Sequence, residues 1–166
     1  MTLRLLPTLL ALLSAAALPA VPEAKSDAPT GLAIVRVYPG WRDAASFKRI
    51  AEYFDRKEHT GGEAILRTHP DQRAGYYFLV RTVNPGAPVQ LTARLQVITS
   101  ANARPAVFTF SPEVGTGKTV FHLGLTGPDW PDAGANPVAW QLELADPGGR
   151  VLATEQSYLW EKPPAK

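Results

Sequence analysis

Apolar and polar residues alternate with a period of two along much of the chain. Segment 89–99 shows this most clearly, because its apolar residues fall at every second position: Val89, Leu91, Ala93, Leu95 and Val97. The residues between them are polar. A strand with this pattern has one face in the core and the other in water. We therefore expect a half-buried strand at 89–99.

Seven more segments have the composition or the alternation of strands, at 32–38, 63–68, 75–83, 106–110, 119–126, 138–145 and 150–160. Turn-forming residues separate them, such as Pro39-Gly40 after the first segment and Asn84-Pro85-Gly86 after the third. Segment 75–83 is apolar on both faces in its first half, which is typical of a central strand that is covered on both sides. About eight strands with turns roughly every 8–12 residues predict an antiparallel sandwich or barrel.

One segment has a different period. Phe47, Ile50, Ala51 and Phe54 fall at helical spacing within 43–56, Asp43 is able to cap the start, and Gly61-Gly62 lies beyond the end. We predict a single helix at 43–56, inserted after the first strand. An exposed stripe of Phe47, Ile50 and Phe54 would favour docking on a partner, whereas a buried stripe would mean that the helix covers a sheet edge.

The last two predicted strands have a further regularity. Every second residue of the first of these strands is apolar and expected to point into the core: Val138, Trp140, Leu142 and Leu144. The turn Asp146-Pro147-Gly148-Gly149 then leads into Leu152. This hairpin is similar to the closing hairpin of immunoglobulin-like and fibronectin-III-like domains. The resemblance implies an antiparallel, immunoglobulin-like β-sandwich of about eight strands with one helix. It implies no function, and the cysteine pair of true immunoglobulin domains is absent.

The start of the chain has the three parts of a secretory signal: Arg4, an apolar run from about residue 5 to 18, and a cluster of small residues. We expect a signal peptide at 1–20, cleaved after Ala17, Ala20 or Ala24. A flexible lead-in at 21–30, a β-sandwich domain at 31–161 and a disordered tail at 162–166 would follow. The protein is then exported, to the periplasm or out of the cell. No later segment has the roughly 20 apolar residues of a membrane span.

The composition excludes several kinds of reactive site and one class of partner. The chain has no cysteine, which excludes thiol nucleophiles, thiolate zinc sites and redox motifs. Its formal charge is only +2 and it contains no run of Lys and Arg, so nucleic acid is not an expected partner.

The motifs that suggest catalysis or cofactors are incomplete. Gly115-Thr116-Gly117-Lys118-Thr119 matches the end of a phosphate-binding loop, but Pro112 replaces the first glycine and a strand pattern follows instead of a helix. We predict a glycine turn between two strands. The histidines, His59, His69 and His122, are far apart in sequence, so no metal site is predicted. No nucleophile elbow occurs, and we expect neither a cofactor nor an enzyme.

The remaining candidates are loop aromatics beside carboxylates. Trp130 lies between Asp129 and Asp132 in the proline-rich loop 127–137, and Trp41 lies in another expected turn. These four residues form a candidate ligand site, because loop aromatics stack on sugar rings or anchor protein partners. The alternative is that Trp130 folds back and plugs one end of the sandwich.

Two functions fit this pattern. The first is a non-catalytic binding or accessory module of the cell envelope that holds a protein, peptide or glycan. The second is a structural or assembly protein that docks through its helix. A pocket with two or more convergent titratable groups would favour a third, an enzyme.

Overall fold

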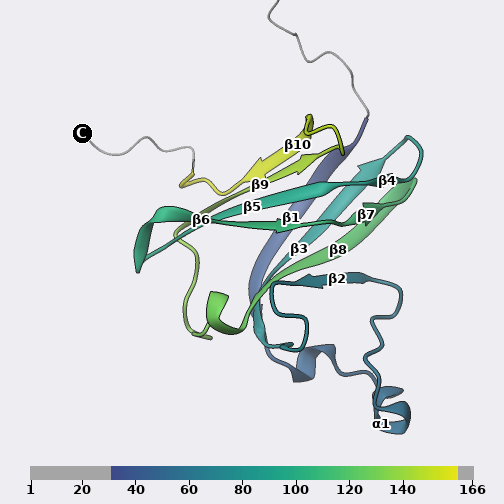
Figure 1. Cartoon of the computed structure of the whole chain (residues 1–166), viewed down its shortest axis with the longest axis vertical. Helices are drawn as coiled ribbons and strands as arrows, with labels where there is room; N and C mark the ends of the chain where they lie inside the picture. Colours follow the sequence, from purple (N-terminus) through teal and green to yellow (C-terminus); the bar gives the residue numbers. More distant parts are fainter. Residues whose placement is uncertain (1–30, 161–166) are drawn as a thin grey trace, which may run out of the picture.

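Ten strands form three sheets in the computed structural model, which describes residues 31–160 (Figure 1). The first sheet has the order β1 (Ala33–Arg42), β3 (Gly75–Asn84), β8 (Gly117–Thr126), β2 (Ala64–Arg67). The second has the order β10 (Val151–Gln156), β9 (Ala139–Ala145), β5 (Thr92–Thr99), β6 (Asn102–Phe110). A short pair joins β4 (Val89–Gln90) to β7 (Glu113–Val114). All pairs are antiparallel except β2 with β8.

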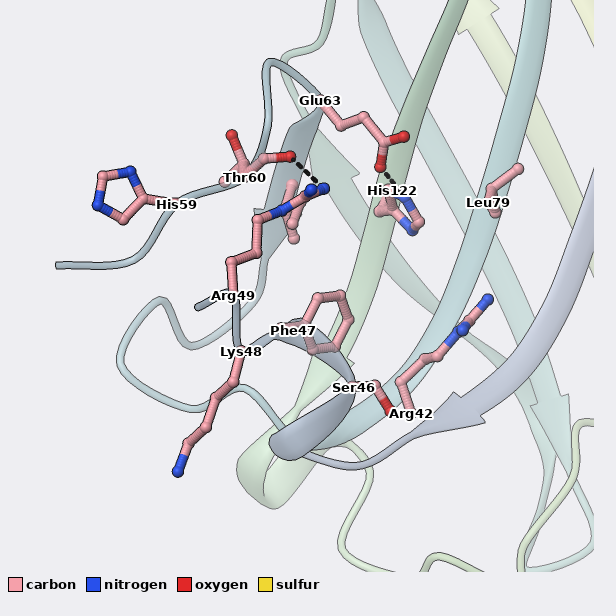
Figure 2. A pocket seen from close by; sticks show the side chains of 11 residues that line it. Arg42, Ser46, Phe47, Lys48, Arg49, His59, Thr60, Glu63, Leu79 and His122 are labelled. Carbon is pink, nitrogen blue, oxygen red and sulfur yellow. Dashed lines mark hydrogen bonds and ion pairs between the residues drawn. The ribbon is translucent and has the colours of Figure 1, made fainter. Parts of the chain in front are cut away.

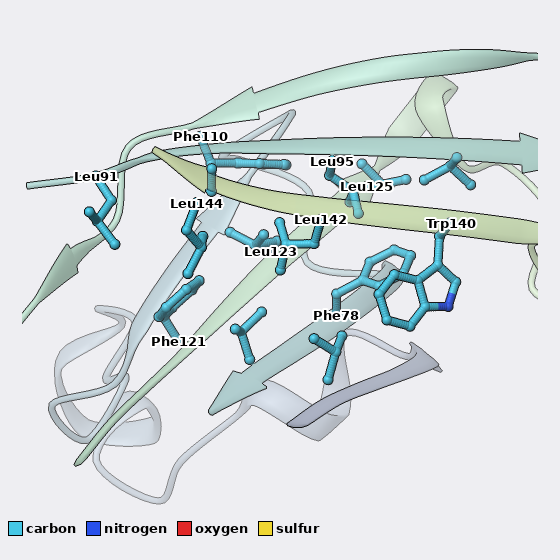
Figure 3. Packing of buried hydrophobic residues seen from close by; sticks show 14 of the residues in the cluster. Phe78, Leu91, Leu95, Phe110, Phe121, Leu123, Leu125, Trp140, Leu142 and Leu144 are labelled. Carbon is cyan, nitrogen blue, oxygen red and sulfur yellow. The ribbon is translucent and has the colours of Figure 1, made fainter. Parts of the chain in front are cut away.

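The two four-stranded sheets face each other across one hydrophobic core (Figure 3). Phe78, Phe121 and Leu123 of the first sheet are fully buried, as are Leu95 and Leu142 of the second. These side chains come from alternate positions of their strands, as the period of two requires. The prediction of a mainly β, antiparallel fold is therefore confirmed.

The strand β3 is central, between β1 and β8, as its sequence predicts. Its even-numbered residues, such as Phe78, point into the core, and its odd-numbered residues lie on the outer face of the sheet. Tyr77 on this outer face is only 1% exposed. A segment outside the sheets must therefore cover this face.

Several strand boundaries differ from the prediction: the strand predicted at 106–110 begins at Asn102, and the one predicted at 150–160 ends at Gln156. Pro39-Gly40 does not end the first strand, because β1 continues to Arg42 opposite Gly75. β1 pairs only with β3, and an edge strand tolerates proline because one of its sides has no ladder to break. The predicted strand at 89–99 is interrupted at Leu91, whose backbone N–H donates to the Pro112 carbonyl at 2.8 Å. The two residues before this break pair with β7, which is too short to show in the sequence pattern.

The predicted helix is present after the first strand, but it does not span 43–56. The segment forms a 3-10 turn, η1 (Ala45–Phe47), and a one-turn helix, α1 (Glu52–Asp55). Lys48 has extended backbone angles, and Arg56 has a left-handed φ of 59° that ends α1. Contacts with the sheet hold this segment in place, and such tertiary contacts override a weak helical pattern. Asp43 still stabilises the first turn, since its carboxylate accepts from the Ser46 N–H at 2.7 Å.

Two of the predicted turns are confirmed. Gly117 has φ +84° and opens β8, so the Gly-Lys-Thr sequence is followed by a strand and lacks the helix of a phosphate-binding loop. Asp146–Arg150 closes the β9–β10 hairpin, with Gly149 at φ +83°. The predicted signal peptide, lead-in and tail lie outside the described residues. Between residues 31 and 160, no helix has the length and apolar character needed to cross a membrane.

Candidate functional site

Residues 43–63, which join β1 to β2, cover the part of the outer face of the first sheet around Tyr77; we call them the covering segment. The ring of Phe47 packs on Tyr77 with 4.6 Å between centroids. The guanidinium of Arg67 lies over the same Phe47 ring at 5.1 Å. This stacking explains why Tyr77 is buried on the side of the sheet that faces away from the core.

Ion pairs fix the covering segment at a second point. The guanidinium of Arg67 donates to both carboxylate oxygens of Glu58, at 2.6 and 2.9 Å, and its Nε donates to the Tyr77 hydroxyl at 2.8 Å. Arg73 pairs with Glu52 at 2.6 Å. Hydrogen bonds from Arg67 lower the pKa of Glu58, and a hydrogen bond from Arg73 lowers the pKa of Glu52. Burial raises the pKa of Tyr77. Charged Glu52 and Glu58 therefore hold the covering segment against the sheet.

One of the two carboxylates of α1 does not lie as the local charge pattern indicates. The sequence pattern indicates that Glu52 and Asp55 lie on an ordinary solvated helix surface. Asp55 is exposed and pairs with His59 at 2.6 Å, but Glu52 is turned toward Arg73 of the body of the protein. Arg73 is distant in sequence, so the local charge pattern could not reveal it.

A pocket of about 420 Å³ lies between the covering segment and the sheet. The sheet contributes Arg42, Leu79 and His122, and the covering segment contributes Phe47 and Arg49. Figure 2 shows Arg42 and His122 on the sheet side with Phe47 and Arg49 facing them. The pocket exists because the covering segment is attached through Phe47 and Glu58 and leaves the sheet uncovered beside them.

The imidazole of His122 is the most buried polar group of this pocket. Its side chain is 8% exposed, and its Nε2 lies 3.1 Å from a carboxylate oxygen of Glu63. Its Nδ1 is buried without a hydrogen-bond partner within residues 31–160. The pocket thus holds two convergent titratable groups, a feature that favours an enzyme.

The other charges of the pocket are positive. Arg42, Lys48 and Arg49 line it, and none of the three forms an ion pair within the described part of the chain. Arg49 donates one hydrogen bond to the Thr60 carbonyl at 3.1 Å. Figure 2 shows Lys48 pointing outward. Only Glu63 supplies a negative charge, and it faces His122. The pocket therefore presents uncompensated guanidinium groups.

The same outer face continues as a basic strip. Arg36 and Arg81 lie opposite each other on β1 and β3, and their guanidinium groups lie over the Tyr38 ring at 5.7 and 5.2 Å. The four strands of this sheet contain Arg36, Arg42, Arg67, Arg81 and Lys118 but no Asp or Glu. Arg67 is neutralised by Glu58. The face as a whole suits an anionic ligand.

The residues of the candidate ligand site occupy different surroundings. Trp130 is 4% exposed, and its ring lies 4.7 Å from that of Tyr76. Trp41 lies on β1 opposite Tyr76 and packs against the core. Asp129 pairs with His69 at 3.2 Å, and Asp132 accepts the Gly134 N–H at 2.8 Å within its turn. Tyr76 thus has both tryptophans beside it. Trp130 folds back and fills one end of the core, which is the second of the two arrangements expected for this residue.

Sequence reasoning did not identify Arg42, Arg49, Glu63 and His122 as a site. His122 alternates with Phe121 and Leu123 and therefore lies on the outer face of its strand, but the covering segment buries it. One signal was available: the four strands of the first sheet carry cations without a single carboxylate. Net charge conceals this, since the acidic residues lie elsewhere.

No family model matches the chain, and no curated protein or solved structure is significantly similar to it. Among residues 31–160, no group of three or more His, Asp or Glu side chains is arranged to hold a metal ion.

Proposed function

We propose that this protein is an exported, non-catalytic binding module of the cell envelope, and that it holds an anionic ligand in the pocket between the covering segment and the first sheet. The observation that supports this most is the set of unpaired cations at one place, with Arg42 and Arg49 in the pocket and Arg36 and Arg81 beside it. Guanidinium groups bind carboxylates through two parallel hydrogen bonds, which gives both affinity and orientation. A glycan or peptide rich in carboxylates is the ligand that fits.

The pairing of Glu63 with His122 supports binding in preference to catalysis. A carboxylate that faces the pocket would repel an anionic ligand. The carboxylate of Glu63 instead faces His122, with 3.1 Å between its oxygen and Nε2 of the imidazole. The Nδ1 of this imidazole is buried and unpaired within residues 31–160, so a ligand in the pocket would not contact it. Its role in this proposal is to fix Glu63 and to support the floor of the pocket.

We also infer that the fold is of the immunoglobulin-like and fibronectin-III-like type. The order β1-β3-β8 in one sheet and β10-β9-β5-β6 in the other has the connectivity of the A-B-E and G-F-C-C′ strands of such domains. β2 departs from this plan, because it precedes β3 in sequence and runs parallel to β8. A crystal structure in which β8 pairs with β9 would contradict the assignment.

Titration calorimetry with defined polymers tests the function. Polygalacturonate serves as the acidic glycan and poly-glutamate as the acidic peptide, with dextran as a neutral control. We expect the double variant Arg42→Ala, Arg49→Ala to bind the acidic polymer about tenfold or more weakly. Arg104→Ala is the matched control, since this exposed arginine of β6 lies on the other sheet and forms no ion pair within residues 31–160.

Two outcomes would refute the proposal. The first is that neither acidic polymer binds. The second is that the Arg104→Ala variant loses as much affinity as the double variant, because binding would then depend on overall charge and not on the pocket. Turnover of either polymer would instead favour an enzyme.

A further inference from the structure

The tip of the covering segment exposes three large apolar side chains side by side. Ile50, Tyr53 and Phe54 are 79%, 77% and 85% exposed. Figure 1 shows α1 projecting away from the body formed by the sheets. Single exposed apolar residues are normal on a protein surface, but neighbouring ones indicate contact with another surface. We call these three residues the apolar tip.

The charges around the apolar tip are sorted by sign. Cations flank it without an ion-pair partner among residues 31–160: Lys48, Arg56 and Lys57. The glutamates of the same segment face the body of the protein: Glu52 pairs with Arg73, Glu58 with Arg67 and Glu63 with His122. Asp55 pairs with His59. The surroundings of the tip therefore present positive charge to whatever the tip contacts.

We propose that the apolar tip inserts into the surface of an anionic lipid bilayer. Ile50 and Phe54 would enter the boundary between headgroups and acyl chains, and Tyr53 would keep its hydroxyl at headgroup level. The flanking cations would contact anionic headgroups, since basic residues at a membrane surface are attracted to such lipids. Apolar side chains with a basic rim combine the two contributions that hold a peripheral protein on a membrane.

The shape of the tip favours a membrane over a protein partner. A stable protein interface takes about 20–30 residues from each side and buries about 800 Å² of each. The apolar tip is one projecting helical turn with three anchoring side chains, which suits insertion into a layer. The base of the segment is fixed by the Glu52–Arg73 and Glu58–Arg67 pairs, so the tip is held in one orientation.

Vesicle co-sedimentation of the purified protein tests this inference independently of the pocket ligand. One set of vesicles contains phosphatidylcholine alone and the other contains phosphatidylcholine with phosphatidylglycerol. We expect binding to the anionic set only. The triple variant Ile50→Ser, Tyr53→Ser, Phe54→Ser should bind about tenfold or more weakly, because the three side chains lose their apolar transfer to the bilayer. These side chains are exposed, so the fold should be unchanged.

Two control variants separate insertion from general attraction. Tyr158→Ser with Leu159→Ser removes two exposed apolar side chains elsewhere, 82% and 50% exposed, and should leave vesicle binding unchanged. Lys57→Glu should weaken binding to anionic vesicles several-fold, and added salt should weaken it further.

Three results would overturn the inference: no sedimentation with anionic vesicles, equal binding to both vesicle sets, or undiminished binding of the triple variant. A triple variant that loses an identified envelope protein from pull-downs, while the wild type ignores vesicles, would instead show that the tip docks on a protein.

Discussion

At the scale of single residues, the outer face of the first sheet is organised around Tyr77. This residue has a glycine beside it on each neighbouring strand, Gly40 on β1 and Gly124 on β8. The two glycines are not equivalent. A Cβ on Gly124 would lie 2.4 Å from Cε1 of the Tyr77 ring, whereas a Cβ on Gly40 would meet nothing within 4 Å. The Tyr77 ring therefore lies over Gly124. In this position it packs against the Phe47 ring, and its hydroxyl accepts a hydrogen bond from Arg67.

We predict that Gly124→Ala destabilises the protein, because the methyl group must displace Tyr77 and with it the contacts of the covering segment. Overpacking of this kind costs about 1–3 kcal/mol. Urea unfolding of the two proteins measures the difference. Gly40→Ala is the matched control and should cost nothing, since alanine suits a strand better than glycine does. Equal destabilisation by the two substitutions would show that the close approach to Tyr77 is not the cause.

At the scale of elements, the strands could be predicted from alternation and the covering segment could not. Val97 and Leu144 lie where the period of two places them, because their strands are solvated on one face. Segment 43–56 has helical spacing, yet Phe47 binds Tyr77 and Glu52 binds Arg73. These partners are some 20–30 residues away in sequence, and no local pattern encodes them. The pocket was missed for the same reason, since its walls exist only after these contacts form.

The attachment of the covering segment should depend on pH. The pKa of Glu58 lies below its ordinary value of 4.5, mainly because Arg67 donates hydrogen bonds to the carboxylate. A carboxyl with a lowered pKa stabilises the folded state fully above its unfolded pKa, and this stabilisation is lost as the pH falls through the folded pKa. The segment is thus held firmly at neutral pH and loosens below about pH 4.5.

An NMR titration of side-chain carboxyl carbons measures this directly. We expect Glu58 to titrate below 4.5 in the wild type and to move back toward 4.5 in Arg67→Met. We also expect Glu58→Gln to cost about 1–3 kcal/mol of stability at neutral pH, because Arg67 is then left with a weaker acceptor. A wild-type Glu58 that titrates at or above 4.5 would contradict this account.

At the scale of the whole molecule, the two sheets differ in charge. The strands of the first sheet carry five cations and no carboxylate, whereas those of the second carry Arg94, Arg104, Glu143 and Glu155. The formal charge of +2 hides this difference. A balanced chain thus has one basic face, which the composition alone could not predict.

We predict that the affinity for an acidic polymer falls as salt is added, because the cations of the basic strip are exposed to solvent and their field is screened over about 10 Å at 0.1 M salt. Removal of Arg81, which lies on the strip outside the pocket, should reduce this salt dependence. Calorimetry at several salt concentrations provides the measurement. A salt-independent affinity would show that the strip does not contribute.

The order of strands in the first sheet also affects the time the chain needs to fold. Every pair in that sheet joins strands distant in sequence, as with Ala33 and Val83 or Ala64 and Phe121. Proteins dominated by such distant pairings fold in milliseconds to seconds, since long loops must close before any contact is gained. The first sheet cannot be completed until β8, which ends at Thr126, is available. A chain that crosses a membrane unfolded would therefore not complete this sheet before about residue 126 has crossed. In the exported protein that we propose, slow assembly of this sheet would keep the chain competent for export.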